Sequence, residues 1–186
     1  MGYKISFSTM SLDSKIPQDD PLWGKFNASF VNRELELHDI ANEIYLARPF
    51  TTWHKNKWRN AVNWELGGHI ALDFDSEDER STLTYLAKDK FIQKYAAFIY
   101  TTPSHTPATP RARVLFVLDQ PIYQAKNYTT AVSALLWLFG TADRQCKDCC
   151  RFFYGSRNCE FEWIDNVLPI EKVKQIIGQY KETGDV

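Results

Sequence analysis

The sequence lacks a long apolar run, and it lacks an excess of charge of either sign. A membrane-spanning helix needs about 20 consecutive apolar residues, and no stretch of this 186-residue chain approaches that length. The first ten residues contain no basic segment followed by an apolar one, so a secretory signal peptide is not expected. Lys and Arg total 22 and Asp and Glu total 23, which gives a net charge of −1. We therefore expect a cytoplasmic protein with no membrane partner.

Cysteine is also scarce, and it is confined to one part of the chain. A disulfide framework would connect distant parts of a small secreted fold, so reduced thiols are expected here. The spacing C-x2-C-C-x8-C could supply zinc ligands, although the second separated C-x2-C pair that is usual in zinc sites is missing. Zinc binding and ordinary packing of buried thiols both remain open. The four cysteines are Cys146, Cys149, Cys150 and Cys159.

The balanced charge and the aromatic content point in opposite directions. A net charge near zero argues against a dedicated nucleic-acid coat, because phosphate contacts dominate the affinity of such proteins. Aromatic residues make up 15% of the chain and include six Trp, and nucleobases stack on such rings. The hydrophobic fraction of 44% is typical of a globular domain.

Apolar periodicity predicts strands that are separated by helices. Residues 1–30 are expected to be irregular, and Gly67-Gly68 is expected to break the chain before the first clear strand. The predicted strands are 69–75 and 111–118, with β-prone runs at 96–101 and 151–154. The predicted helices are 37–46, a segment from a capping box at 76–79 to residue 95, 124–139 and 169–180. This pattern is typical of an α/β or α+β sheet fold.

Two carboxylates end the first predicted strand. Asp73 and Asp75 are two residues apart, so in a strand both side chains point to the same side. Such a pair can hold one or two hard divalent cations, and two metals can stabilise both oxygens of a phosphoryl displacement. The alternative is that Asp75 caps the following helix and Asp73 faces solvent.

A polar loop and the strand after it offer candidate phosphate ligands. His105 follows Ser104 in a loop stiffened by proline, and Arg111 and Arg113 lie on one face of the next strand. Histidine and arginine can donate hydrogen bonds to phosphate oxygens. The alternative is a surface loop whose arginines pair with acids.

Three further features lie on either side of these segments. Asp143 follows a predicted helix end and could bring a third carboxylate, and Arg151 opens the last β-prone run. The stretch 48–60 carries four basic residues and no acidic one. Its candidates for contact with a nucleic-acid strand are Lys55, Trp58 and Arg59, although core packing would equally explain the tryptophans.

Taken in order, these segments resemble the archaeo-eukaryotic primase (AEP) superfamily, in its bacterial, plasmid and phage primase-polymerase branch. The family's first motif is an apolar strand with D-x-D, its second centres on a His before an R-x-R strand, and its third is an acid followed by an Arg-aromatic run. The matching segments are 72–75, 104–105 with 111–116, and 143 with 151–155. The stretch 50–59 also resembles the segment before the first motif, and the resemblance covers roughly residues 30–160.

The resemblance implies a role for each matching residue. Asp73, Asp75 and Asp143 would be the catalytic carboxylates and would bind two divalent cations, Mg²⁺ or Mn²⁺. The nucleotide-binding residues would be His105, Ser104, Arg113 and Arg151, of which His105 and Arg151 contact the triphosphate. Two departures stand out. Pro103 occupies the usual Ser position of Ser-x-His, and Cys149-Cys150 replaces a small polar pair.

The resemblance also implies a fold, an activity and partners. The fold would be an α+β AEP-like catalytic core, with mixed sheets and flanking helices arranged as an RRM-like half and an N-terminal α/β half. It would form a single catalytic domain over 1–186, with an N-terminal module (about 1–68), a motif-bearing sheet (69–160) and a terminal helix (161–186).

The expected activity is that of a DNA primase-polymerase that makes or extends primers from (d)NTPs on a single-stranded DNA template. Such a protein would belong to a prokaryotic cell, plasmid or phage, fused to or acting with helicase, replication or CRISPR adaptation proteins. Two alternatives use the same residues: a metal-dependent phosphodiesterase or nuclease, and a non-catalytic single-stranded nucleic-acid-binding module.

Overall fold

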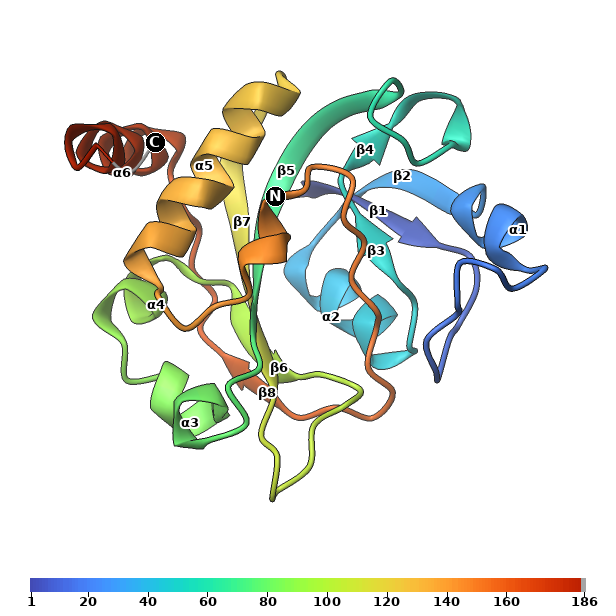
Figure 1. Cartoon of the computed structure of the whole chain (residues 1–186), viewed down its shortest axis with the longest axis horizontal. Coiled ribbons are helices and arrows are strands. Elements are labelled where there is room, and N and C mark those ends of the chain that lie inside the picture. The colour runs from blue at the N-terminus through green and yellow to red at the C-terminus, as the bar shows by residue number, and fades with distance from the viewer. Residues whose placement is uncertain (185–186) are drawn as a thin grey trace.

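Two antiparallel β-sheets lie side by side in the computed structural model, which describes residues 1–184 (Figure 1). The smaller sheet has the strand order β2-β1-β3, and the larger sheet has the order β4-β5-β7-β6-β8. The strands are β1 Tyr3–Ser8, β2 Phe30–Leu35, β3 Phe50–Thr51, β4 Trp53–His54, β5 Trp64–Phe74, β6 Phe98–Thr101, β7 Ala112–Ile122 and β8 Phe161–Trp163. The fold is therefore mixed α+β, as expected.

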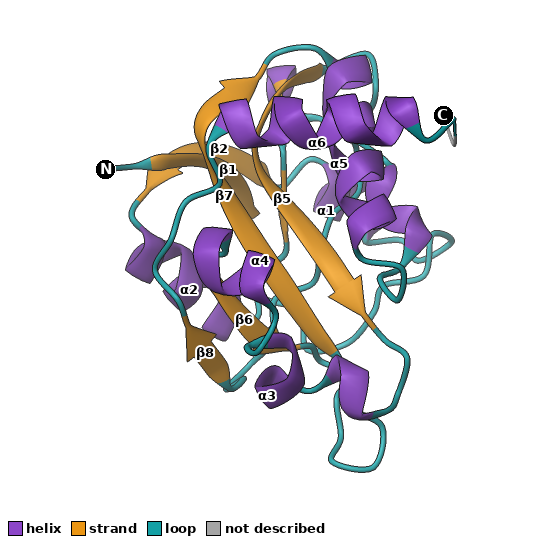
Figure 2. Cartoon of the chain, turned by 90° about the vertical axis from the view of Figure 1, so that its left-hand side faces the viewer, coloured by secondary structure: helices purple, strands orange, loops and turns teal. Residues whose placement is uncertain are grey.

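Helices α3 to α6 cover one face of the larger sheet (Figure 2). The α-helices are α1 Trp23–Asn27, α2 Leu37–Tyr45, α3 Leu83–Leu86, α4 Lys90–Tyr95, α5 Ala125–Leu138 and α6 Ile170–Glu182. Three short 3₁₀ turns are η1 Lys55–Lys57, η2 Glu79–Ser81 and η3 Arg144–Lys147. No helix among residues 1–184 is long and apolar enough to cross a membrane.

The predicted strands 69–75 and 111–118 are confirmed as β5 and β7, which pair with each other in the larger sheet, where β7 is the central strand. The prediction that Gly67-Gly68 breaks the chain is wrong, because β5 runs through both glycines with a register irregularity there. A Cβ atom on Gly68 would lie 2.3 Å from the backbone oxygen of Lys4 in β1. Glycine is therefore required where the two sheets approach each other.

The single helix predicted between residues 76 and 95 is wrong. Three short pieces replace it, and their N-caps are Asp78, Thr82 and Asp89. Ser76 caps no helix, because its hydroxyl bonds instead to Asp78 and Ser81. The other three predicted helices are confirmed as α2, α5 and α6, with ends that differ by one or two residues.

Two further expectations need correction. Residues 1–30 are not irregular throughout, because Tyr3–Ser8 forms the centre of the smaller sheet and Trp23–Asn27 is helical. The β-prone run 151–154 forms no strand, and its one bridge joins Phe153 to Phe50 in β3. This segment thus passes from the larger sheet to the smaller one (Figure 1).

Candidate active site

A cavity of about 910 Å³ opens where β5 ends and β7 begins. Its volume lies within the range of roughly 300–1,000 Å³ that is typical of small-molecule sites. Six segments of the chain line it: the N-terminal loop with the start of α1, the connection between β4 and β5, the end of β5, the loop before β7, the start of β7, and the chain between α5 and β8. The candidate residues in its wall are Arg59, Asp73, Asp75, Ser104, Arg111, Arg113, Asp143 and Arg151.

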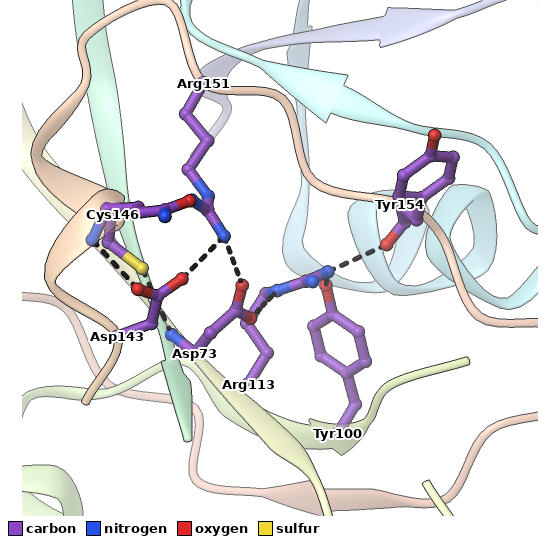
Figure 3. A network of polar contacts seen from close by, with 8 residues as sticks. Asp73, Tyr100, Arg113, Asp143, Cys146, Arg151 and Tyr154 are labelled. Atoms are coloured by element: carbon purple, nitrogen blue, oxygen red, sulfur yellow. Dashed lines mark hydrogen bonds and ion pairs between the residues drawn. The ribbon is translucent and has the colours of Figure 1, made fainter. Parts of the chain in front are cut away.

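Strand register places a buried ion pair at the base of this cavity. Asp73 in β5 is the cross-strand partner of Arg113 in β7, and Arg113 is in turn the partner of Tyr100 in β6. Directly opposed residues share a face of a sheet, so the three side chains meet. Arg113 donates from Nε to Oδ1 of Asp73 at 2.5 Å and from Nη1 to the hydroxyl of Tyr100 at 2.6 Å (Figure 3).

Arg113 is committed to these contacts rather than free for a ligand. Its Nη1 also donates to the backbone oxygen of Tyr154 at 2.8 Å, and its side chain is only 6% exposed. Burial disfavours its charge, but Asp73 and Tyr100 outweigh that effect and raise the pKa of Arg113. For Tyr100, by contrast, burial raises the pKa, so its hydroxyl remains protonated. Arg113 therefore fixes one oxygen of Asp73.

Asp143 lies beside Asp73 because the chain after α5 pairs with the end of β5. The backbone N–H of Asp143 donates to the backbone oxygen of Asp73 at 2.8 Å, next to a bridge between Phe74 and Ala142. The Oδ1 atom of Asp143 accepts a hydrogen bond from the backbone N–H of Gln145 at 2.9 Å. One oxygen of this carboxylate is thus anchored, as it is in Asp73.

Arg151 occupies the space between the two remaining carboxylate oxygens. Its Nη2 atom lies 3.2 Å from Oδ2 of Asp73 and 2.9 Å from Oδ2 of Asp143 (Figure 3). The sequence prediction placed these three residues in one site, and the structure brings them together there. In the described chain, the two Oδ2 atoms share one cation, which is the guanidinium of Arg151.

Cys146 adds a thiol to the same cluster. Cys146 lies in the turn η3, which begins directly after Asp143. Its Sγ accepts a hydrogen bond from the backbone N–H of Asp73 at 3.4 Å. Ligand atoms of Cys146, Asp73 and Asp143 all lie within 4.8 Å of one another. Burial, followed by the nearby carboxylate of Asp73, raises the pKa of the thiol to about 12.

Asp75 occupies a different position from the one predicted. Strand β5 ends at Phe74, so Asp75 lies one residue beyond it, where the alternation of a strand no longer sets its direction. It is exposed and lines the cavity, but it is not among the described residues whose ligand atoms cluster with those of Asp73 and Asp143. Of the five aspartates that line the cavity, Asp73 and Asp143 thus lie close together, and Asp75 lies apart from this pair.

The predicted polar loop is divided between two cavities. Ser104 lines the main cavity, whereas His105 lines an adjoining one of about 310 Å³ that shares Thr102 and Pro103 with it. The Nδ1 atom of His105 accepts a hydrogen bond from the backbone N–H of Arg111 at 3.0 Å, so its proton lies on Nε2. Arg111 itself is ion-paired with Glu77.

The four cysteines do not gather at one point. Cys146 belongs to the cluster with Asp73 and Asp143, whereas Cys149 and Cys150 lie with Asp148 in a second group. Cys159 belongs to neither group and lines the smaller cavity. All four thiols are free. The described chain therefore does not bring the four cysteines into one group of ligands, and zinc binding by any of them stays a prediction.

The candidate strand-binding residues lie on the connection between β4 and β5. Lys55 is exposed, as is Trp58 with 41% of its surface accessible. Arg59 turns inward, donates to the backbone oxygen of Cys150 at 2.5 Å, and lies 4.8 Å above the ring of Phe152. Arg59 also lines the main cavity, so this connection leads directly to it.

Sequence reasoning missed the wall that the N-terminal loop contributes. Lys15, Gln18 and Trp23 all line the main cavity. The loop is tied to the site by a hydrogen bond from the backbone N–H of Ile16 to the Tyr154 hydroxyl at 2.9 Å. No local pattern in residues 11–22 signals this contact, because it joins positions far apart in the chain.

The fold and this site define an α+β domain with an acidic cluster at the edge of its larger sheet. The structure is similar to the AEP domain of the cyanophage S-2L primase-polymerase (PrimPol), with a TM-score of 0.54. Sequence identity is 8%, and the similarity covers 94% of this chain and 89% of that chain. The sequence matches no protein-family model. It also has no match among curated protein sequences. What the structures share is therefore the fold.

Proposed function

We propose that this chain is a metal-dependent nucleotidyltransferase that makes or extends DNA primers from (d)NTPs on a single-stranded template. The observation that carries the proposal is the pair of Oδ2 atoms from Asp73 and Asp143, which face one shared cation inside a cavity large enough for a nucleotide. The fold of a phage primase-polymerase domain supports the same assignment.

The residues at this position suit a hard divalent cation. Carboxylate oxygens are the ligands that Mg²⁺ and Mn²⁺ prefer, and the protein already stabilises a positive charge between Asp73 and Asp143. Asp75 lines the same cavity and would supply a further carboxylate. Divalent cations bound here would lower the pKa of an attacking 3′-hydroxyl and neutralise the triphosphate.

Arg151 would change partners when substrate binds. In the free protein its guanidinium offsets the repulsion between two neighbouring carboxylates. Once other cations take that role, the guanidinium becomes available for phosphate oxygens, with which arginine forms strong, directional hydrogen bonds. This assignment keeps the triphosphate role for Arg151 and explains how the residue is held before substrate arrives.

Arg113 receives a different role from the one that the family resemblance implied. Its side chain is 6% exposed, and its Nε and Nη1 atoms already donate to Asp73, Tyr100 and Tyr154, so we assign it to holding Asp73 rather than to contacting phosphate. Ser104 and Lys15 line the cavity and would contact the substrate. His105 would donate from Nε2 at the boundary of the two cavities.

The experiment is primer synthesis on single-stranded DNA, with ATP and dNTPs supplied separately and Mg²⁺ compared with Mn²⁺. Asp143→Asn removes charge but keeps the oxygen that caps Gln145, so it should abolish incorporation, a loss of at least 100-fold, while the protein stays folded. Asp39→Asn, an exposed change on α2, is the matched control and should retain full activity.

The products also separate the alternatives. Products longer than a labelled DNA substrate support the proposal, whereas shorter products formed without nucleotides indicate a nuclease. DNA binding that is unchanged by chelation, with no nucleotide binding and no product, indicates a non-catalytic module. Normal polymerisation by Asp143→Asn would overturn the proposed roles.

A further inference from the structure

We infer that Asp73, Asp143 and Cys146 form a three-ligand site for a thiophilic divalent cation of the Zn²⁺ class. The inference rests on the proposed cation position at Asp73 and Asp143 but not on nucleotide transfer. It adds a sulfur ligand, and therefore a different class of metal, to a site whose oxygen ligands alone favour Mg²⁺ or Mn²⁺.

The backbone holds the sulfur close to the carboxylates. Asp143 is the N-cap of η3, and the backbone N–H of Cys146 donates to the backbone oxygen of Asp143 at 3.2 Å. This hydrogen bond closes a turn that brings Cys146 back toward Asp143, and their ligand atoms lie within 4.8 Å of each other. Cys146 is 2% exposed, and its Sγ is fixed by the backbone N–H of Asp73.

The two oxygens are equally well oriented. Arg113 anchors Oδ1 of Asp73, and the N–H of Gln145 anchors Oδ1 of Asp143, so each residue presents Oδ2 toward the same point. Outer hydrogen bonds of this kind orient metal-binding carboxylates. The guanidinium of Arg151, which pairs with both Oδ2 atoms, shows that a positive charge is stabilised at that point.

The donor set selects the metal. Two carboxylate oxygens and one thiolate suit Zn²⁺ or Cd²⁺, which accept sulfur, and three protein ligands leave a fourth tetrahedral position open. Mg²⁺ requires oxygen ligands in an octahedron and gains nothing from the thiol. On binding, the thiol proton is released to solvent and the sulfur electron pair forms the metal bond. A thiophilic cation would therefore compete with the catalytic cations and with Arg151.

Cadmium is the probe, because a cadmium–thiolate bond absorbs in the ultraviolet and reports on sulfur directly. The full chain carries Cys149→Ser and Cys150→Ser, which removes the second cysteine group with Asp148. We expect Cd²⁺ to give this absorbance and to saturate at one equivalent. Cys146→Ser should abolish the signal, and Cys159→Ser, outside both groups, should preserve it. Absence of the signal, or its persistence in Cys146→Ser, overturns the inference.

Two further variants keep the test decisive if Cys146→Ser disturbs folding. Asp143→Asn leaves the thiol intact and should weaken Cd²⁺ binding at least tenfold, whereas Arg151→Gln removes the competing cation and should strengthen it several-fold. Unchanged affinity in both variants overturns the site. A chain that polymerises without Cys146-dependent absorbance contradicts this inference alone, and one with the absorbance but no polymerase activity contradicts only the proposed function.

Discussion

Arg113 is the residue on which the geometry of the cluster most depends. It is buried, and its partners come from three parts of the chain: Asp73 in β5, Tyr100 in β6 and the backbone of Tyr154. Removing one member of a buried ion pair leaves the other charge without compensation, which costs more than the pair itself contributes. Loss of the Arg113 side chain should therefore both destabilise the domain and displace the carboxylate of Asp73.

We predict that Arg113→Met lowers the free energy of unfolding by about 3–5 kcal/mol, measured by urea denaturation. Arg80→Met is the matched control, because Arg80 pairs with Asp78 at the surface and its loss should leave the midpoint unchanged. Equal stability of Arg113→Met and the wild type would contradict the proposed role of this ion pair.

Two buried histidines predict acid sensitivity. Burial lowers the pKa of His69 to about 4 and that of His54 to about 4. Between this value and the ordinary pKa near 6.5, the unfolded chain binds protons that the folded chain does not. Stability is therefore present above pH 6.5 and is lost as the pH falls toward 4. For His69 the slope approaches about 1.4 kcal/mol per pH unit.

The measurement is urea unfolding at pH 7 and at pH 5. His69→Gln should flatten the dependence on pH even if it lowers stability at pH 7, because it removes the group that gains a proton on unfolding. His54→Gln should change the slope in the same direction. Identical slopes for the wild type and both variants would contradict the assignment.

The sequence indicates that some of these residues belong to one site, but it does not show which contacts the others make. Asp73, Asp143 and Arg151 could be grouped because the segments that carry them resemble, in order, the motifs of one family. The partner of Arg113 could not be predicted, because it depends on the register between β5 and β7. Cys146 was considered only together with the other cysteines, because the spacing of cysteines in the sequence does not show that η3 turns this thiol toward two carboxylates.

At the scale of elements, the approach of β1 to β5 holds the two sheets together, and Gly68 permits it. A Cβ atom there would meet the backbone oxygen of Lys4 at 2.3 Å, and backbone cannot yield as a flexible side chain can. We predict that Gly68→Ala lowers the free energy of unfolding by about 1–3 kcal/mol or more, measured by denaturant titration.

Gly178 offers the matched control within a helix. Nothing lies within 4 Å of a Cβ atom placed there, and the residue is exposed in α6. Gly178→Ala should raise stability by about 0.5–1 kcal/mol, because alanine loses less backbone freedom than glycine on forming a helix. A destabilisation by both changes would point to a general intolerance of alanine rather than to the contact at Lys4.

There are physical reasons why the sequence alone did not predict every strand correctly. Strand β1 was missed because the prolines at positions 17 and 21 and the glycine at position 24 made the whole of residues 1–30 look irregular. Its own residues Tyr3, Ile5 and Phe7 nevertheless alternate and are all buried. Strand β5 is buried along most of its length, because helices cover one side and β1 approaches the other. Burial from both sides is a tertiary property that one strand cannot reveal.

For the molecule as a whole, the net charge of −1 conceals an uneven distribution. The connection between β4 and β5, residues 55–63, carries Lys55, Lys57 and Arg59 and no acid. In the cavity, Asp73 and Asp143 are compensated by arginines, and we propose that metal replaces part of that compensation. A near-neutral total is therefore compatible with a local surface that attracts phosphates.

This connection leads to the last prediction, that residues 55–63 bind single-stranded DNA next to the cavity. Trp58 and Val62 are exposed at 41% and 91%, beside the cations, and the inward side chain of Arg59 reaches the cavity wall. Base stacking on an aromatic ring contributes about 1–3 kcal/mol, so Trp58→Ala should weaken binding by roughly fivefold to 100-fold. Lys55→Ala with Lys57→Ala should reduce the salt dependence, because each lost phosphate contact removes about 0.7 from the slope of log K against log salt. Fluorescence anisotropy with a labelled oligonucleotide over a salt series measures both effects.

Tyr123→Ala and Lys181→Ala change an aromatic ring and a cation on other parts of the surface, and they should leave both quantities unchanged. If these controls weaken binding as much as the changes in 55–63, DNA is held by the surface in general, and this connection does not guide the template toward Asp73 and Asp143.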